Sequence, residues 1–443
     1  MPRSNLLQRL DNIRPIKVHG RVCRAVGLTI EGTGPVTSVG QSCRIISPGG
    51  ECVEAEVVGF RDNRVLVMPL GEVRGIGPGS RLMYEPDNPS VPVGPGLLGR
   101  ILDGLGHPLD GKGPVPATTS YPLYSPSLNP LDRARITKPL DLGVRAINGL
   151  LTCGGGQKVG IFAGSGVGKS VLLGMMCRQT AADVTVLALI GERGREVKEF
   201  IEKELGEEGL RKTVVIAATS DQPPLVRLRG AFIATAIAEY FRDQGRDVLL
   251  LMDSLTRVGH AQREVGLAVG EPPTSKGYPP SVFTILPRLL ERVGPTTTGS
   301  LTGLYTVLVE GDDLADPVAD FVRAILDGHI VLSRELASRA HFPAIDVLQS
   351  VSRVMPDITE PAHMDSARAL KELLSLYRNA EDLINLGAYR SGSNPRLDLA
   401  VSMMDPITQF LRQGISERAD LATSLQGLDQ LVAQARELGG QTS

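Results

Sequence analysis

The chain has 443 residues, too many for one ordinary hydrophobic core, and this length predicts two or three domains. Hydrophobic residues make up 42% and charged residues 22%, as in ordinary soluble globular proteins. The formal net charge of −2 lacks the basic surplus of a protein whose main partner is nucleic acid.

The cysteines, histidines and apolar runs of the sequence indicate the cellular compartment in which the protein is expected. Five cysteines without C-x-x-C spacing indicate reduced thiols in a cytosol rather than a disulfide framework. The six histidines pair with no cysteine at zinc-ligand spacing, so we expect no structural metal. No apolar run approaches the roughly twenty residues that span a bilayer, and the first residues lack the apolar core of a signal peptide. We therefore expect a cytoplasmic protein.

Residues 1–19 form an amphipathic segment in which Leu6, Leu7, Leu10 and Ile13 recur at helical spacing. A helix this short is marginal by itself, so the apolar stripe is expected to pack on something. Two interpretations stay open: the stripe packs on its own domain, or it docks a partner protein.

Residues 20–90 carry short β-branched runs broken by glycine and proline, a pattern typical of a small antiparallel β-barrel. Such a barrel can bind single-stranded nucleic acid where exposed aromatic rings line a basic groove. This stretch offers Phe60 and Tyr84 as its aromatic residues. We therefore interpret it as a structural or oligomer-forming barrel.

The next domain is expected over residues 91–363. Its first part, through residue 145, is rich in proline and glycine and predicts an irregular connection wrapped on the rest. Apolar strands then alternate with amphipathic helices, and their continuous Val, Leu and Ile runs predict a parallel sheet buried on both faces. Strands are expected near residues 159, 184, 214, 248, 305 and 329, and helices over 169–180, 194–205 and 224–244.

After Met364 the β signal stops, and three amphipathic stretches predict a C-terminal helical domain over residues 364–443. The expected fold class is therefore multidomain. It combines an N-terminal antiparallel β-barrel, a central α/β domain with a parallel sheet and a C-terminal α-helical domain.

The stretch KVGIFAGSGVGKSVLL, residues 158–173, has the strand–loop–helix context of a phosphate-binding P-loop. Its glycines let successive N–H groups point at one anion, and the helix N-terminus adds partial positive charge. Lys169 is expected to reach the β- and γ-phosphates, and the Ser170 hydroxyl to bind Mg²⁺. The strict pattern opens with Gly where this chain has Ala163, which a strand end tolerates.

The central domain is therefore predicted to be a P-loop NTPase with a RecA-like parallel sheet. The P-loop residues expected to bind the nucleotide are Gly164, Ser165, Gly166, Val167, Gly168, Lys169, Ser170 and Val171.

Carboxylates that follow two apolar strands are candidates for the metal and for water activation. Asp253 ends VLLLMD and is expected to hold Mg²⁺ through its waters, although a strand-final Asp also serves as a helix N-cap. Glu192 follows another strand, where a carboxylate can orient and partly deprotonate water. Glu196 competes with it: it shares a helix face with Glu192 if the helix has begun, and can bind a metal-bound water. The alternative is a solvated helix start.

Arg353, in SVSRVMP, is a candidate for stabilising the transition state. In multimeric NTPases such a positive charge often comes from the neighbouring subunit. Arg353 lies just before the helical domain and can therefore lie at a subunit edge. Position alone does not assign it.

Four motifs in one chain, FAGSGVGKS, GERGREV, LLLMDSLTR and PAIDVLQSVSR, resemble the catalytic subunits of rotary ATP synthases over about residues 20–440. The runs over 270–294 and 387–398 are similar to those of ATPases of the type III protein-export apparatus, most closely the flagellar branch, with the injectisome ATPase as a near cousin. Rotary synthases carry an acidic lever at the second run, where this chain has glycine, serine, asparagine and arginine. Proton-driven synthesis is therefore disfavoured.

The resemblance implies roles for single residues. Glu192 becomes the catalytic carboxylate, and Arg193 beside it contacts the nucleotide or a switch that senses it. Asp253 takes the Walker B role, and Arg353 is similar to an arginine finger. Phe342 matches an aromatic that packs against adenine, although from sequence a core aromatic before proline fits as well. The expected cofactors are ATP and Mg²⁺.

The resemblance also implies partners. Because Glu192 and Arg353 occur in one chain, every interface can be completed by identical copies, which predicts a homohexamer. A stator-like regulatory export protein at the N-terminal stripe, a central stalk-like export protein, export substrates with their chaperones and peripheral contact with a membrane export gate are expected. No nucleic-acid partner is expected. The implied location is the cytoplasmic face of the inner membrane.

Two rival functions remain open at this point. A ring helicase of the transcription-termination type shares the core and an N-terminal barrel, but the aromatic-poor barrel and the net charge weigh against it. A nucleotide-sensing structural subunit would hold ATP without turnover, and Glu192 weighs against that.

Overall fold

The computed structural model describes residues 19–441 except 36, 86–87 and 310–315. The chain divides into two compact units, a smaller one built mainly from the first 90 residues and a larger one from residue 91 onward. The predicted N-terminal stripe over residues 1–15 lies outside the described residues. No helix of the described part is long and apolar enough to cross a bilayer.

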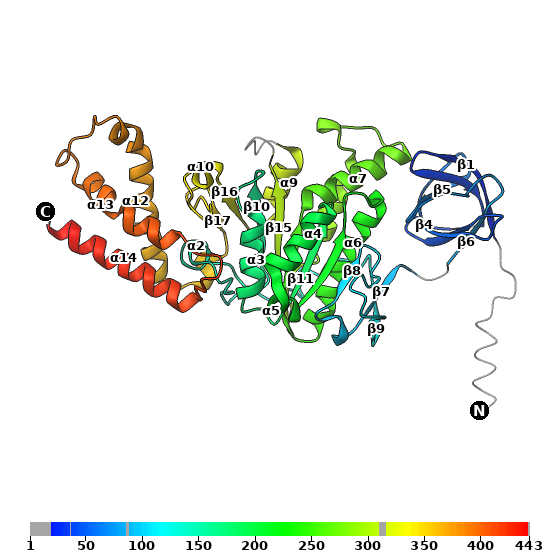
Figure 1. Cartoon of the computed structure of the whole chain (residues 1–443), viewed down its shortest axis with the longest axis horizontal. Helices are drawn as coiled ribbons and strands as arrows, with labels where there is room; N and C mark the ends of the chain where they lie inside the picture. Colours follow the sequence, from blue (N-terminus) through cyan, green and yellow to red (C-terminus); the bar gives the residue numbers. More distant parts are fainter. Residues whose placement is uncertain (1–18, 36, 86–87, 310–315, 442–443) are drawn as a thin grey trace, which may run out of the picture. The chain divides into compact units, whose positions relative to one another are not determined.

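The smaller unit is a closed antiparallel barrel, as the sequence predicts (Figure 1). Its apolar residues alternate with exposed ones and point into one core, which includes Val22, Ile30, Ile45, Val67 and Leu82. The strand order is β1-β2-β5-β4-β3-β6. The bounds are β1 (Gly20–Val26), β2 (Thr29–Thr33), β3 (Ser42–Ile46), β4 (Cys52–Arg61), β5 (Arg64–Pro69) and β6 (Arg81–Tyr84).

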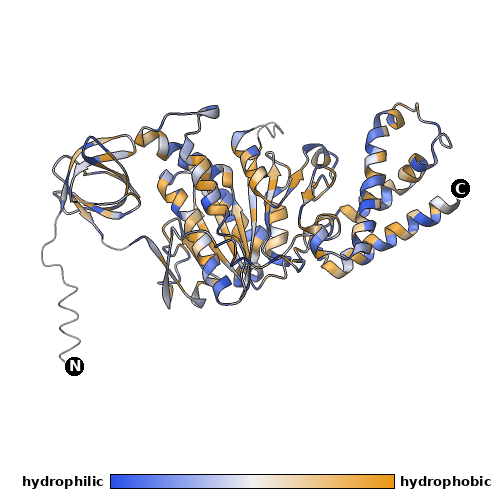
Figure 2. Ribbon diagram, turned by 180° about the vertical axis from the view of Figure 1, so that it is seen from behind, coloured by the Kyte–Doolittle hydropathy of each residue, from blue (hydrophilic) through white to orange (hydrophobic). Residues whose placement is uncertain are grey.

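The larger unit is organised around a mainly parallel sheet of order β17-β16-β10-β15-β13-β11-β12-β8, with β14 paired to β15. The six predicted strands form its centre and are coloured largely hydrophobic in Figure 2. Their apolar side chains are buried. They are β10 (Lys158–Ala163), β11 (Val184–Ile190), β12 (Thr213–Ala218), β13 (Asp247–Asp253), β15 (Ser300–Leu308) and β16 (Gly328–Leu332). Two short strands run antiparallel, β14 (Gly294–Pro295) and β17 (Val351–Ser352).

The connection expected to be irregular contains short strands that the sequence did not predict. Within it, β8 (Ile101–Asp103) adds a parallel edge strand beside β12, and β7 (Ser90–Val93) pairs with β9 (Thr119–Pro122). A buried ion pair holds this segment, with Arg100 Nε 2.7 Å from Asp110 Oδ2. Strands this short, set among glycines and prolines, carry no periodicity that sequence reasoning could detect.

Helices cover the faces of the sheet, where their apolar faces pack on the strands. The short segments η1 (Pro95–Leu97) and η3 (Ser275–Gly277) are 3₁₀ turns, and η2 (Phe200–Leu205) is π-helical. The α-helices are α2 (Arg145–Leu150), α3 (Lys169–Gln179), α4 (Gly194–Glu199), α5 (Gly206–Arg211), α6 (Pro224–Asp243), α7 (Leu255–Val269), α8 (Pro280–Leu290), α9 (Pro317–Ile325), α10 (Arg334–Ser338) and α11 (Met355–Ile358).

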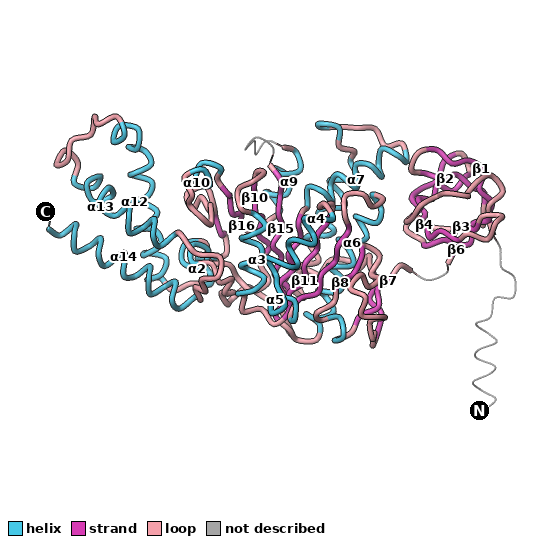
Figure 3. Tube along the Cα trace, in the orientation of Figure 1, coloured by secondary structure: helices cyan, strands magenta, loops and turns pink. Residues whose placement is uncertain are grey.

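The C-terminal part is helical, as predicted (Figure 3). It consists of α12 (Pro361–Asn385), α13 (Pro395–Leu411) and α14 (Leu421–Gln441). The loop between α12 and α13 is fixed by Asp398, which accepts hydrogen bonds from the Gly392 N–H (2.8 Å) and the Tyr389 hydroxyl (2.9 Å). Residues of α13 and α14 share one buried cluster with α2 and the central sheet. The helical region is therefore packed directly on the nucleotide-binding core.

Candidate active site

A cavity of about 870 Å³ opens at the carboxyl ends of the parallel strands. Its walls include most of the predicted P-loop together with Glu192, Arg193 and Glu196. These side chains come from separate strand–helix turns, and the sheet brings them to one edge because its strands are parallel. The cavity is therefore where the sequence predicts nucleotide chemistry.

The P-loop has the backbone expected of an anion site. Gly166 and Gly168 adopt φ values of 77° and 86°, which favour glycine. Gly168 is the N-cap of α3 and no side chain caps that helix, so its first N–H groups face the loop. Ala163 is the last residue of β10, paired with Leu308 and Leu332 on its two neighbours, which explains why this position accepts alanine.

The side chains of Val167 and Val171 do not line the cavity. Val167 is buried in the core cluster, and Val171 packs against it. Only the backbone N–H groups of these two residues are therefore available to a phosphate. Ser170, by contrast, is exposed and lines the cavity.

Lys169 bridges the two predicted carboxylates. Its Nζ lies 2.5 Å from Oδ1 of Asp253 and 3.5 Å from Oε1 of Glu192. The three side chains are between 5% and 15% exposed. Thr306 holds Asp253 in place, since its hydroxyl donates to Asp253 Oδ1 at 2.7 Å. One positive charge therefore faces two negative ones in a largely buried cluster.

Burial raises the pKa of Glu192 above its usual range, and the negative charge of Asp253 raises it further, while Lys169 acts in the opposite direction. Its Oε1 atom is buried and has no hydrogen-bond partner among the described residues. Lys169 lies within ion-pairing distance of this atom without the geometry of a hydrogen bond. A buried acceptor without a hydrogen-bond donor, at a raised pKa, is suited to take a proton from water.

The residues present fit a magnesium ion. Asp253 and Ser170 offer the hard oxygen ligands that Mg²⁺ prefers, and they flank the end of the P-loop.

The helix that carries Glu196 has not begun at Glu192. Helix α4 begins at Gly194, after Glu192, because the chain turns at Gly191 with a φ of 73°. Glu192 and Glu196 therefore do not share a helix face. Glu196 is about half exposed and accepts a hydrogen bond from the Arg193 backbone N–H at 3.4 Å, as a helix-start residue does.

Phe342 lies beside the P-loop. A Cβ atom built on Gly168 would be 3.4 Å from Cδ1 of its ring. The side chain is 46% exposed, which excludes the core aromatic considered from sequence. Its carbonyl accepts a hydrogen bond from the Gln413 N–H at 3.0 Å, so the helical region helps to fix it.

Arg353 and Arg193 are both exposed, but they lie at different positions relative to the cavity. Arg193 lies at the rim of the cavity, with its side chain 81% exposed. Arg353 follows β17 at the edge of the sheet and is absent from the residues that line the cavity in the described part of the chain. The two halves predicted for one active site are therefore apart in a single copy.

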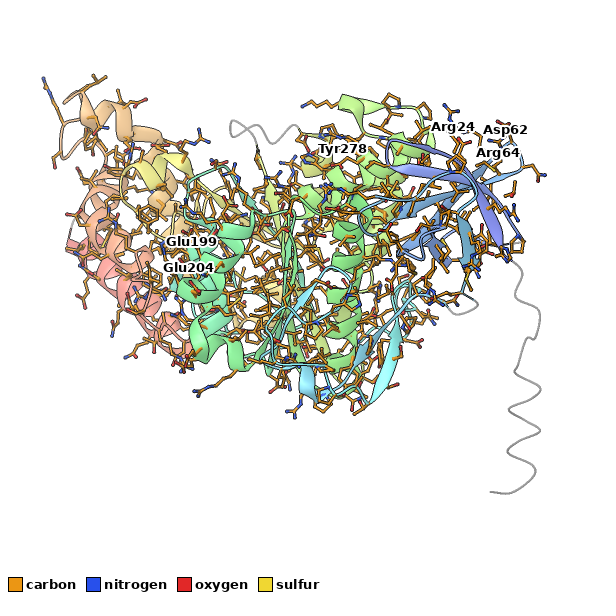
Figure 4. All side chains as sticks on the ribbon, turned by 45° about the vertical axis from the view of Figure 1, so that its right-hand side comes forward. Arg24, Asp62, Arg64, Glu199, Glu204 and Tyr278 are labelled. Atoms are coloured by element: carbon orange, nitrogen blue, oxygen red, sulfur yellow. The ribbon has the colours of Figure 1, made fainter. Side chains whose placement is uncertain are left out.

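Sequence reasoning missed several residues of the cavity wall, namely Thr256, Arg257, His260, Lys276, Asp316 and Arg334. The motif LLLMDSLTR contains the first two and could have signalled them. Arg257 packs against Gly191, and its Nε atom is buried without a hydrogen-bond partner among the described residues. The His260 ring stacks on the ring of Tyr278, which is labelled in Figure 4. His260 Nε2 lies 3.0 Å from the Tyr278 hydroxyl.

Comparisons with known proteins identify the family of this chain. Residues 143–352 match the ATP synthase alpha/beta family, nucleotide-binding domain, and residues 359–430 match the T3SS EscN ATPase C-terminal domain. The chain is 54% identical over 421 residues to the flagellum-specific ATP synthase of Pseudomonas aeruginosa, covering 94% of this chain and 93% of that protein. It is 49% identical over 431 residues to the type 3 secretion system ATPase of Sinorhizobium fredii, covering 97% and 96%.

A solved structure of the assembled ATPase EscN from the enteropathogenic E. coli type III secretion system is 47% identical, with a TM-score of 0.88. The match covers 93% of this chain and all of that one. These findings confirm the predicted fold class and the resemblance read from the motifs. This chain belongs to the family of flagellum-specific ATP synthases and type 3 secretion system ATPases, and it is an ATP hydrolase of type III protein export.

Proposed function

We propose that six copies of this chain close a ring in which each active site lies at a subunit interface and takes Arg353 from the neighbouring copy. One observation carries this proposal: Lys169 of the cavity wall contacts both Glu192 and Asp253, while Arg353 is exposed at the sheet edge and does not line that cavity in the described part of the chain. A second copy can supply the missing guanidinium. The solved relative EscN is described as assembled, which supports self-association.

The reaction follows from the charges of the cavity. The phosphates of ATP offer Lys169 new acceptors along the P-loop, and Asp253 is then free to hold metal-bound water with Ser170. When bound, Mg²⁺ neutralises charge on the phosphate oxygens. Glu192 orients the attacking water and takes its proton, which is worth roughly 10²- to 10⁴-fold in rate. Arg353 stabilises the charge that develops on the γ-phosphoryl oxygens.

The remaining predicted site residues have supporting roles in the proposal. Arg193 contacts the nucleotide from the rim of the cavity, and Glu196 binds a metal-bound water. Phe342 packs on the adenine ring, because it is an exposed aromatic next to the last glycine of the P-loop.

We assign the domains as a barrel over 20–90, an ATPase domain over 91–363 and a helical domain over 364–443. Residues 1–19 dock a stator-like export protein. A central stalk-like protein is a further partner, supported by the solved complex of the relative EscN with its central stalk EscO. The ring acts on export substrates and their chaperones in the cytoplasm, at the inner-membrane face near the export gate.

No observation favours the helicase alternative. Of the two aromatic residues of the barrel, Phe60 is exposed, whereas Tyr84 is partly buried and burial raises its pKa to about 12. The basic residue Arg64 lies 3.3 Å from Glu31 rather than in a basic groove, and Asp62 sits beside it in the β4–β5 turn (Figure 4). Phe60, Tyr84 and Arg64 therefore do not form the stacked aromatic rings in a basic groove that single strands need.

The test mixes two inactive variants. Arg353→Ala chains keep an intact cavity, and Lys169→Ala chains keep an intact arginine. Mixed rings contain interfaces that combine both intact halves, so ATP hydrolysis should reappear when the two proteins are combined. Steady-state phosphate release measures it at several mixing ratios. An absence of recovery at every ratio would overturn the trans arginine.

A further inference from the structure

Asp346 is the centre of a hydrogen-bond network that shapes the turn after β16. Its side chain is 2% exposed. Oδ1 accepts from the N–H groups of Leu348 (3.0 Å) and Gln349 (3.1 Å), and Oδ2 accepts from the Gln349 side-chain amide (3.0 Å). The Asp346 N–H donates to the Val331 carbonyl of β16 at 2.9 Å. One buried carboxylate therefore fixes this turn on the sheet.

The turn leads directly to Arg353. Ser350 donates from its hydroxyl to the Asp346 carbonyl (2.6 Å) and accepts from the Val331 N–H (2.9 Å). Strand β17 then pairs antiparallel with β16, and the Arg353 N–H donates to the Asp327 carbonyl at 3.0 Å. The backbone position of Arg353 thus depends on how the turn at Asp346 is held.

The helical domain completes this network from outside the sheet. Arg378 of α12 forms a two-pronged ion pair with Asp346, with Nη2 2.7 Å from Oδ2 and Nη1 3.2 Å from Oδ1. Such paired, charge-assisted bonds fix orientation as well as distance. Without Arg378, the buried carboxylate keeps its backbone bonds but loses its opposite charge, which is costly for a buried group.

We propose that Arg378 is a positioning residue for hydrolysis at the adjacent active site, because through Asp346 it ties the placement of α12 to the loop that carries Arg353. A helical domain that shifts on the nucleotide-binding core moves this turn and thereby presents or withdraws the guanidinium. The inference rests on the proposed trans role of Arg353 and adds the connection by which the helical domain controls it.

A second ion pair between the same two parts of the chain provides a matched control. Arg339 follows α10, and its Nη1 lies 2.5 Å from Oε1 of Glu381 on α12. This pair also joins the nucleotide-binding core to α12, but the hydrogen bonds of its side chain do not reach the turn at Asp346. If Arg378 acts merely by docking α12, removing either arginine should have the same effect.

The experiment compares Arg378→Gln with Arg339→Gln in the full-length protein. A misplaced catalytic group costs up to about 10²-fold in rate, so Arg378→Gln should lower kcat by roughly 10- to 100-fold. KM and the affinity for a fluorescent ATP analogue should not change, since the cavity of the same chain is intact. Arg339→Gln should hydrolyse ATP at nearly the wild-type rate. An equal loss in both variants, or a weaker analogue affinity in Arg378→Gln, would overturn the inference.

Mixing separates this inference from the proposal on which it rests. Combined with Lys169→Ala chains, Arg378→Gln chains should regain activity, because their cavities then receive a well-placed Arg353 from the neighbour. One outcome is that ATP hydrolysis recovers in the mixture with Arg353→Ala chains but not in the mixture with Arg378→Gln chains. In that case Arg378 acts within its own cavity, and the inference about Arg378 is wrong while the trans arginine stands. If neither mixture recovers, the trans arginine itself is wrong.

Discussion

The phosphate cavity and the sheet edge that carries Arg353 are built in opposite ways. In the cavity, Lys169 already pairs with two carboxylates, and its side chain is 14% exposed. Arg353 is exposed, and in the described chain it lies away from that cavity. The first region is a charge cluster formed within one chain, whereas the second, in our proposal, has its function beside another copy. The proposal therefore makes assembly, rather than folding, the step that completes the catalytic site.

The largest effect should come from Arg353→Ala, which removes the half-site contributed by the neighbour. We expect kcat to fall by roughly 10³- to 10⁵-fold, the usual contribution of an arginine supplied in trans. ATP-analogue affinity of the isolated chain should stay at the wild-type level. Arg368→Ala is the control, because Arg368 is also an exposed arginine, paired with Asp365 on α12. Steady-state ATP hydrolysis by Arg353→Ala at the wild-type rate would contradict the proposal that Arg353 completes the site of a neighbouring copy.

Next in size is Glu192→Gln, which keeps the shape of the side chain and removes its basicity. We expect kcat to fall by roughly 10²- to 10⁴-fold, because the attacking water loses its proton acceptor. Glu199→Gln is the matched control, since Glu199 lies at the end of α4 and pairs with Arg195 (Figure 4). The rate of phosphate release measures this effect. Wild-type turnover by Glu192→Gln would exclude Glu192 as the catalytic base.

A smaller effect is expected from Phe342→Ala, which tests whether the aromatic ring beside the P-loop contacts the nucleotide. Loss of stacking on the base costs about 1–3 kcal/mol, so KM for ATP should rise roughly 5- to 150-fold with kcat little changed. Phe60→Ala, in the barrel, removes an equally exposed ring, 50% against 46%, and should leave KM unchanged. Equal KM values in all three proteins would remove Phe342 from the nucleotide site.

The smallest expected effect concerns the pH dependence of ATP hydrolysis. Burial raises the pKa of Glu192, so as pH falls its carboxylate is protonated at a higher pH than the roughly 4.3 of an ordinary glutamate. Because the base must be ionised to act, kcat/KM should decline on the acid side above that value. The residual activity of Glu192→Gln should lack this decline. The same acid limb in both proteins would assign it to another group.

The sequence predicts the cavity better than the edge, for a physical reason. The P-loop, Glu192 and Asp253 each follow an apolar strand, and parallel strands must bring their carboxyl ends together. The six central strands are visible as continuous apolar runs, and the C-terminal helices by their helical periodicity. Arg353 has no local pattern of this kind and was assigned through the resemblance.

What the sequence could not predict depends on contacts between distant segments. Strand β8 is too short to carry a period. Lys276 of η3 and Arg334 at the start of α10 reach the cavity wall from segments with no catalytic motif. Whether Glu192 begins a helix was decided by the turn at Gly191. The pairing of Asp346 with Arg378 joins residues 32 positions apart in the sequence and has no signature in either segment.

The most direct measurement is a structure of the assembled ring bound to Mg²⁺ and a non-hydrolysable ATP analogue. We expect the Arg353 guanidinium of one copy to lie within hydrogen-bonding distance, about 3 Å, of a γ-phosphate oxygen held by Lys169 of the next copy. An Arg353 side chain that is remote from every bound nucleotide in the closed ring would contradict it.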